Sequence, residues 1–291
     1  MKTFHLKDLQ PILVLLLCLM SFACQKNVSS TGQGSGKSSL NIYLTDDPSL
    51  VFDHVFLDIT KVEIKVEDDS ESHQDSEHQG DVDDHDRNGD NDGGWMNVDI
   101  HPGVYDILRF RNGLDTLFGD ISFDATKGLK KVRITLGNSN SVVFNGTNFP
   151  LFINGNDNIV VINIDESIVA FHSGGLTNFW IDIDAGRSIK IHGNEFELNP
   201  SVKIFSREKS ASIEGRVFPP NAQAVIMAIN GTDTASAIPE DEGEFKFIGL
   251  KPGSYALLFH ATANNYIDTT ISNIFVNGKD DVHVPTVTLH Q

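Results

Sequence analysis

The sequence predicts an all-β protein with two consecutive β-sandwich domains, which follow an N-terminal signal helix and a flexible tether. Two observations predict this fold class. Apolar residues alternate with polar ones in many short runs, which is the period of a strand with one buried face, and Asn-Gly or Gly-Asn pairs typical of tight turns separate several of these runs. No long apolar stripe repeats at helical spacing, so packed sheets of short strands are the expected architecture.

Residues 1–23 have the features of a secretory signal peptide. Basic residues precede an apolar run from Pro11 to Met20, which is shorter than the ~20 residues that a transmembrane helix needs. The small residues before Cys24 resemble a bacterial lipobox. We therefore predict that Cys24 is lipidated and becomes the membrane-anchored first residue of the mature protein. The alternative is an ordinary cleaved signal peptide followed by an incidental cysteine.

Residues 24–38 are polar and rich in glycine and serine, a composition that behaves as a flexible coil, and we interpret them as a tether. The only other cysteine, Cys18, lies in the signal peptide. The folded body is therefore expected to have neither a disulfide nor a cysteine nucleophile.

The formal net charge of −18 is concentrated in one segment. Residues 68–92 contain eleven acidic residues and one basic residue, Arg87, so this stretch alone contributes −10. The rest of the chain is only mildly acidic. No basic stripe is present to neutralise phosphates, which disfavours binding to nucleic acid.

We place the first domain at residues 39–206, with an acidic insert at 68–94. Leu40, Ile42 and Leu44 alternate with polar neighbours. The alternating runs Val55–Ile59 and Val62–Val66 differ by a one-residue shift in phase, which predicts a β-bulge. Further strands are predicted at Val104–Phe110, Leu117–Phe123, Lys131–Leu136, Ser141–Phe144, Ile159–Ile164, Phe179–Ile183, Ser188–His192 and Val202–Phe205.

The second domain is expected at residues 211–291, because the chain becomes polar at Ser206–Ser210 and a new series of strands follows. These strands are predicted at Ile213–Phe218, Ala224–Ile229, Phe245–Ile248, Ser254–His260 and Ile271–Val276.

Several separated segments in residues 39–206 resemble a family of bacterial envelope domains known as domain of unknown function 4382. The resemblance covers more than half of the chain and implies a β-rich lipoprotein ectodomain, but no reaction. The family commonly has a short turn where this chain has its acidic insert. The matching segments are Ser39–Pro48, Pro102–Leu108 with Asn112-Gly113, Val132–Gly137 through Ser141-Val142, and Asp182-Ile-Asp184 with Arg187-Ser188.

Residues 211–291 resemble the carboxypeptidase regulatory-like modules, which have a prealbumin-like sandwich. The resemblance implies an accessory spacer or binding domain without catalysis. It rests on Ile213–Val217, Gly243–Phe247, Gly249-Leu250 and Pro252–Tyr255.

The acidic insert contains a candidate calcium loop. Carboxylates or amides occupy positions 1, 3, 5, 7 and 9 of the loop, and Gly89 occupies position 6, where such a loop turns sharply. Position 12 is Trp95 instead of a bidentate glutamate, so the segment is not an EF-hand. A solvated acidic hairpin without specific metal binding is the alternative. The candidate ligands are Asp84, Asp86, Asn88, Asp90 and Asp92.

Other chemical motifs are weaker. His73, His78 and His85 could bind zinc or copper, but their spacing matches no known pattern. His192 and Glu195 have the His-x-x-Glu spacing of zinc carboxypeptidases, which we attribute to chance. Asp182 and Asp184 could suit glycoside chemistry, although capping of a strand end beside Arg187 is the favoured interpretation. Trp95 and Trp180 are expected in the core, with stacking on sugar rings as the alternative.

The sequence thus predicts a non-catalytic cell-envelope lipoprotein that binds a glycan or a protein partner, or has a structural role. Its expected location is the outer membrane, facing the periplasm or the cell surface. One alternative is a calcium-binding structural lipoprotein that uses the acidic insert. The other is a hydrolase of envelope polymers, which would require four residues to converge in one pocket: His192, Glu195, Asp182 and Asp184.

Overall fold

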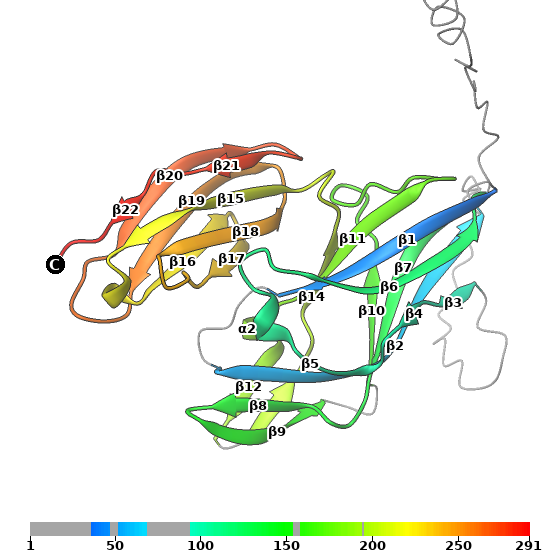
Figure 1. Cartoon of the computed structure of the whole chain (residues 1–291), viewed down its shortest axis with the longest axis horizontal. Helices are drawn as coiled ribbons and strands as arrows, with labels where there is room; N and C mark the ends of the chain where they lie inside the picture. Colours follow the sequence, from blue (N-terminus) through cyan, green and yellow to red (C-terminus); the bar gives the residue numbers. More distant parts are fainter. Residues whose placement is uncertain (1–35, 47–51, 69–93, 154–157, 194) are drawn as a thin grey trace, which may run out of the picture. The chain divides into compact units, whose positions relative to one another are not determined.

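The computed structural model describes residues 36–46, 52–68, 94–153, 158–193 and 195–291. The predicted signal peptide, Cys24, the three histidines of the acidic insert and the five candidate calcium ligands lie outside these residues. Within the described ranges, no helix is both long enough and apolar enough to span a membrane. The described residues form four β-sheets (Figure 1), which confirms the predicted all-β class.

The first sheet has five strands in the order β14-β11-β1-β6-β4. Its central strand β1 alternates buried and partly exposed residues, as the sequence predicted, and pairs in parallel with β11 and antiparallel with β6. The strand bounds are β14 (Val202–Phe205), β11 (Leu176–Ile183), β1 (Lys37–Thr45), β6 (Thr116–Asp124) and β4 (Asp99–Ile100).

The second sheet follows the order β10-β7-β2-β8-β9-β13-β12, with β3 and β5 also paired to β2. Strand β2 contains both alternating runs, and its register with β7 shifts between Ile59 and Lys61, which confirms the predicted bulge. The strand bounds are β10 (Ile159–Asn163), β7 (Lys127–Leu136), β2 (His54–Asp68), β8 (Ser141–Phe144), β9 (Thr147–Ile153), β13 (Glu195–Leu198), β12 (Ile189–His192), β3 (Trp95–Asn97) and β5 (Gly103–Asp106).

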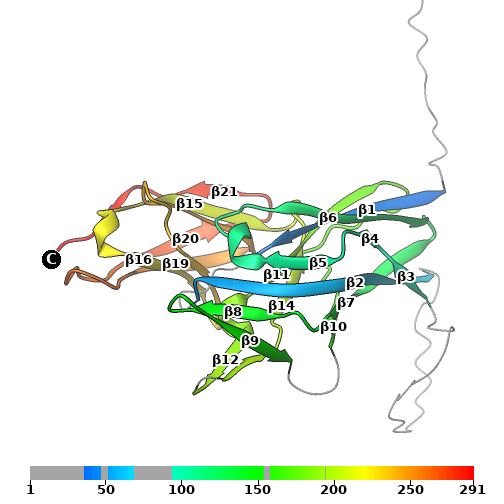
Figure 2. The ribbon, with the colours of Figure 1, turned by 60° about the horizontal axis from the view of Figure 1, so that its bottom comes forward.

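The third and fourth sheets comprise residues 211–288 (Figure 2). Phe245 on β18 and Phe259 on β19 make an edge-to-face contact at 5.6 Å between ring centroids, which joins the apolar faces of these two sheets. The third sheet contains β18 (Glu244–Leu250), β15 (Ala211–Phe218), β21 (Asp281–His283) and β22 (Val287–Thr288). The fourth contains β17 (Asp233–Ala237), β16 (Ala224–Asn230), β19 (Gly253–Ala261) and β20 (Thr269–Val276).

The buried apolar side chains fall into two clusters. One lies among residues 40–205 and the other among residues 211–289. Burial of apolar surface is the main favourable term in folding, so each pair of sheets has its own source of stability. Ile248 of β18 packs against the first cluster and connects the two parts.

Several predicted boundaries differ from the structure, and three of them change the element that is formed or where the domain begins. The predicted strand Val104–Phe110 ends at Asp106, and residues 107–110 form the 3₁₀ helix η3 (Ile107–Phe110). Ile107 and Leu108 are adjacent and both buried, which differs from the alternation expected of a strand with one buried face.

The predicted strand at Ser188 begins one residue later, at Ile189, after the single helical turn α2 (Ala185–Ser188). Strand β1 begins at Lys37, two residues before the predicted domain start. Ser38 is fully buried, and its hydroxyl accepts a hydrogen bond from the Gly174 backbone. A second 3₁₀ helix, η4 (Pro220–Ala222), lies between β15 and β16.

Candidate ligand pocket at the ends of β11 and β14

Two of the segments that carry the family resemblance, Ser39–Pro48 and Asp182–Asp184, meet because β1 and β11 are parallel. The register pairs Thr45 with Asp182, so the carboxyl ends of both strands lie at the same edge of the sheet. Asp46 follows directly, and its side chain accepts a hydrogen bond of 3.4 Å from the backbone N–H of Ala185. Asp46 and Asp182 are both nearly completely buried. Parallel pairing therefore places two carboxylates, 136 positions apart in the sequence, in one region.

A third segment of the family resemblance, Asn112-Gly113, lies beside these two because its turn contacts Thr45 at the end of β1. The Thr45 hydroxyl lies 3.1 Å from the carbonyl oxygen of Phe110 and 3.0 Å from that of Leu114. These contacts hold the intervening turn, in which both Asn112 and Gly113 have positive φ angles, as an Asn-Gly turn requires. Three segments that are far apart in the chain thus come together.

Strand β14 supplies a lysine to this group. Asp182 and Lys203 are directly opposite in the antiparallel pair of β11 and β14, and Lys203 Nζ lies 2.9 Å from Asp182 Oδ2. The other carboxylate oxygen, Asp182 Oδ1, is buried and has no hydrogen-bond donor in the described residues. A buried acceptor without a donor is costly, so this oxygen marks a position where a donor is missing.

Asp184 has a different role from Asp182. Its side chain caps α2 by accepting a hydrogen bond of 2.8 Å from the backbone N–H of Arg187, and the Arg187 guanidinium lies 3.4 Å away. The favoured interpretation of this residue as a cap beside Arg187 is thus confirmed. Burial raises the pKa of the Asp184 carboxyl above its ordinary value, although the contacts with Arg187 oppose this shift.

The second pair of sheets contributes the opposite wall. Arg187 Nη2 donates a hydrogen bond of 3.2 Å to the carbonyl oxygen of Thr234, and Lys251 Nζ lies 3.5 Å from Asp165 Oδ2. The turn that carries Lys251 is held by Tyr255, whose buried hydroxyl donates a hydrogen bond of 2.9 Å to the carbonyl oxygen of Lys251.

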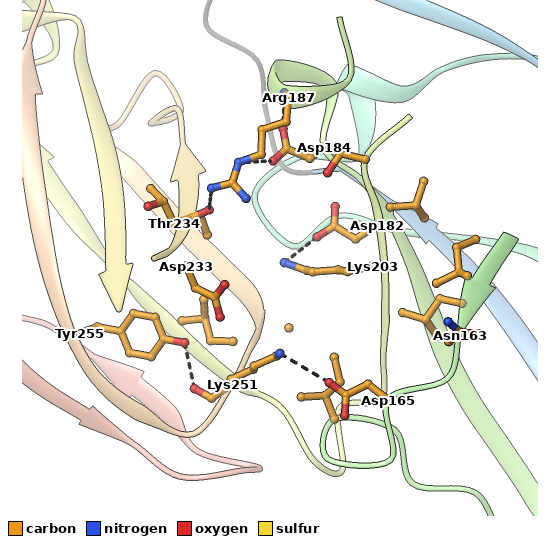
Figure 3. A pocket seen from close by; sticks show the side chains of 18 residues that line it. Asn163, Asp165, Asp182, Asp184, Arg187, Lys203, Asp233, Thr234, Lys251 and Tyr255 are labelled. Carbon is orange, nitrogen blue, oxygen red and sulfur yellow. Dashed lines mark hydrogen bonds and ion pairs between the residues drawn. The ribbon is translucent and has the colours of Figure 1, made fainter. Parts of the chain in front are cut away.

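These walls enclose a pocket of about 310 Å³ (Figure 3). A smaller cavity of about 20 Å³ shares Asp182 and Lys203 with it, and Asp46 and Asn112 also line this cavity. The Asn112 side-chain oxygen is buried without a donor, as Asp182 Oδ1 is. The charged and phenolic side chains that line the larger pocket are Asp165, Asp182, Asp184, Asp233, Arg187, Lys203, Lys251 and Tyr255.

The charges of the larger pocket nearly cancel. Its three cationic side chains are each paired with a carboxylate, and the fourth carboxylate, Asp233, has an exposed side chain that points into the pocket (Figure 3). Hydrogen bonds from the Ser167 hydroxyl and backbone N–H lower the pKa of Asp165, and the Lys251 charge adds to this effect. The pocket therefore holds ionised groups in fixed pairs and carries one excess negative charge.

Other residues considered from the sequence lie elsewhere. His192 and Glu195 are opposite each other in the β12–β13 hairpin, and His192 Nε2 is 3.5 Å from Glu197. Neither residue lines the pocket that contains Asp182 and Asp184. The convergence required by the hydrolase alternative is therefore absent among these four residues.

The two tryptophans differ in exposure. Trp180 is only 7% exposed and stacks on Tyr43 at 4.9 Å and on Phe205 at 5.9 Å between ring centroids, which confirms the predicted core position. Trp95 is partly exposed, and the Arg133 guanidinium lies 4.3 Å from the centre of its ring. Trp95 is thus only partly buried and its ring contacts a cation, which differs from the core position predicted for it.

Sequence reasoning missed four charged residues of the pocket, Asp165, Lys203, Asp233 and Lys251. Each is a single charged residue in an ordinary strand or turn, and only the tertiary structure brings them together. Among the residues that the structure describes, no group of three histidine, cysteine, aspartate or glutamate side chains is arranged to hold a metal ion.

The fold and the pocket define an all-β sandwich protein with a pocket of paired charges. The model of the family Domain of unknown function (DUF4382) matches residues 37–200, more than half of the chain. The chain belongs to this family, which confirms the resemblance seen in its separated segments. The match indicates no catalytic family.

Comparison with curated proteins gave no match. Similar solved structures include a type II cohesin–X-dockerin complex from Acetivibrio cellulolyticus, with 21% identity and a TM-score of 0.23 over 27% of this chain. The aligned region spans 56% of that chain, about half of its length. GBS52, the minor pilin of Streptococcus agalactiae, has 10% identity and a TM-score of 0.21, and covers 88% of this chain and 95% of its own. The Bacillus anthracis TIE protein has 10% identity and a TM-score of 0.22, with 87% of this chain and 34% of its own covered.

Proposed function

We propose that the protein is a non-catalytic cell-envelope lipoprotein whose pocket binds a small hydroxyl-rich ligand, such as a unit of a glycan. The observation that carries this proposal is the set of three cation–carboxylate pairs around a pocket of about 310 Å³. Pockets of this size and larger are typical of small-molecule sites.

Alternating ammonium and carboxylate groups suit hydroxyl groups. A sugar hydroxyl donates one hydrogen bond and accepts others, so it fits between a carboxylate oxygen and a neighbouring ammonium group. Hydrogen bonds to charged groups each contribute about 1.5–3 kcal/mol net. The Tyr255 ring is only 3% exposed, so recognition relies on these polar contacts and not on stacking against that ring.

The same pairing argues against catalysis at this pocket. A general acid or base must be free to exchange a proton with the substrate. Asp182 is fixed by Lys203, Asp165 by Lys251 and the Ser167 hydroxyl, and Asp184 by the α2 turn. Three of the four carboxylates that line the pocket are thus held in place by neighbouring groups.

The ligand test uses residues 36–291 and isothermal titration calorimetry against a panel of neutral mono- and oligosaccharides. For any saccharide that binds, Lys203→Met and Lys251→Met should each weaken binding by about tenfold or more, since one charge-assisted hydrogen bond is lost. Lys190→Met, at an exposed position of β12, is the matched control and should bind normally. Thermal melts of each variant establish that it is folded. Failure of every saccharide tested, neutral or amino, to bind, or unchanged affinity in both pocket variants, would overturn the proposal.

Membrane attachment through Cys24 is the second part of the proposal, with residues 211–291 as a carboxypeptidase regulatory-like spacer. Cys24→Ser in the full chain should move the protein from the detergent fraction to the aqueous fraction in a phase-separation assay, whereas Cys18→Ser should remain with the detergent. Equal partitioning of both variants would contradict the anchor.

A further inference from the structure

The carboxylates that line the pocket outnumber its cationic side chains by one. Arg187, Lys203 and Lys251 are its three cationic side chains, and each already has a carboxylate partner. A ligand therefore meets no unpaired cation among the described residues that line the pocket.

Two carboxylates of the same pocket have unused accepting capacity. The side chain of Asp233 forms no ion pair or hydrogen bond in the described part of the chain, and it points into the pocket (Figure 3). Asp182 is 4% exposed, and its Oδ1 is buried without a donor. This oxygen adds to the excess of acceptors over donors beside the pocket.

The charge balance points in the same direction. Asp165, Asp182 and Asp184 neutralise the three cations, which leaves the charge of Asp233 uncompensated. A ligand with a carboxylate or a phosphate would add negative charge beside Asp233 without finding an unpaired cation. A ligand with one positive charge would cancel the excess and supply the missing donors.

We infer that the natural ligand carries a protonated primary amine among its hydroxyl groups, as in an amino sugar whose nitrogen is not acetylated. The ammonium group binds Asp233, and the hydroxyl groups bind the three ion pairs. This inference rests on the proposed glycan site, because it specifies the chemistry of the ligand for the same pocket.

The experiment compares sugars that differ only at the amine. Residues 36–291 are titrated at pH 6 with glucosamine and glucose, galactosamine and galactose, and mannosamine and mannose, with the N-acetyl forms as a third member of each set. For at least one set, the free amine should bind at least tenfold more tightly than both the neutral and the acetylated forms. The preference should weaken as salt rises, because an exposed ion pair is screened.

Two variants assign the preference to the pocket. Asp233→Asn should reduce the preference for the free amine to about twofold or less, and it should fold normally because the Asp233 side chain forms no ion pair or hydrogen bond in the described part of the chain. Asp241→Asn, an exposed aspartate outside the pocket, should retain the full preference.

Each contrary outcome identifies what is wrong. Equal binding of free amines and neutral sugars would overturn the amine inference and leave the proposed glycan site intact. A preference that persists in Asp233→Asn would also overturn the inference. Failure of the neutral and amino sugars together would overturn the proposed function itself.

Discussion

At Gly249 the absence of a side chain allows β18 to approach Phe205. Gly249 has a φ of +68°, and a Cβ atom there would lie 2.6 Å from the Phe205 ring. Phe205 belongs to the first cluster and Gly249 to the strand that bears Phe245 and Phe247 of the second. This glycine is therefore required both by its backbone conformation and by the contact between the two parts of the chain.

Gly249→Ala should lower the free energy of unfolding by about 2–4 kcal/mol, since the clash adds to the cost of a positive φ angle. Gly231→Ala is the matched control, because Gly231 has a φ of +60° and no atom within 4 Å of the position that an alanine methyl would occupy. It should cost only about 1–2 kcal/mol. Urea unfolding of both variants measures the difference, and equal losses would contradict a role for the Phe205 contact.

Glu63 is a buried carboxylate with two cationic partners on the second sheet. Lys61 Nζ lies 2.6 Å and Arg133 Nε 2.7 Å from its oxygens. Burial by itself raises the pKa of Glu63, but hydrogen bonds from Arg133 and Lys61 outweigh it, so the pKa falls below the ordinary value of 4.5.

Because the pKa of Glu63 is lowered by folding, ionised Glu63 stabilises the folded state above pH 4.5. This contribution is lost as the pH falls through the lower folded-state pKa. Glu63→Gln should therefore destabilise the protein by about 1–3 kcal/mol at pH 7 and flatten the loss of stability below pH 4.5. Glu67→Gln, on the more exposed part of β2, is the control. The free energy of unfolding is measured for both proteins between pH 7 and pH 3. If it falls with pH by the same amount in the wild type and in Glu63→Gln, the prediction is wrong.

At the scale of elements, the parallel pair β1–β11 is the feature that builds the pocket. It aligns Tyr43 with Trp180, and the antiparallel pair β11–β14 aligns Trp180 with Phe205, so three aromatic rings stack across three strands. Two residues further along β11, on the same face of the sheet as Trp180, the same register places Asp182 opposite Lys203. A one-residue slip would move every one of these side chains to the other face of the sheet.

The acidic insert, whose candidate ligands lie outside the described residues, is the candidate calcium site of the alternative function. If that alternative holds, millimolar calcium should raise the melting temperature of residues 39–291 relative to EDTA, and the rise should disappear when Asp84, Asp86 and Asp90 are changed to alanine. Extracellular calcium modules bind with Kd values of about 10⁻⁴–10⁻³ M, so the ion must be supplied at millimolar concentration. Replacing Asp120 and Asp124 on β6 with alanine is the control. No calcium-dependent shift in the wild-type protein would contradict the proposal.

At the scale of the whole molecule, the two apolar clusters suggest that residues 211–291 fold as an independent domain. All the buried members of the second cluster lie between Ala211 and Leu289. A core that draws on no other segment does not need the rest of the chain for its stability.

The fragment 208–291 should therefore unfold cooperatively when it is expressed alone. Its stability should be lower than in the full chain, because Ile248 and the surface around Gly249 lose their contacts with the first part. Far-UV circular dichroism during heating measures this, with a Phe259→Ala variant of the fragment as a destabilised reference. A gradual, non-cooperative melt of the fragment would contradict an independent domain.

Much of the fold could be predicted because period-two alternation reports which face of a strand is buried. The runs at Ser141–Phe144 and Val202–Phe205 match their strands residue for residue. The pattern failed where burial follows no alternation, as in η3, and where short strands carry mixed residues, as in β17 (Asp233–Ala237).

The sequence by itself determined the all-β class, the bulge of β2, the Asn-Gly turns and the family, because these depend on local patterns or on separated segments in a fixed order. Only the tertiary structure decided which charged side chains meet. Asp182 and Lys203 are 21 positions apart and Asp165 and Lys251 are 86 apart, and no local pattern encodes either pair. The pocket exists because parallel and antiparallel registers bring the ends of distant strands to one edge, and register depends on the packing of the whole core.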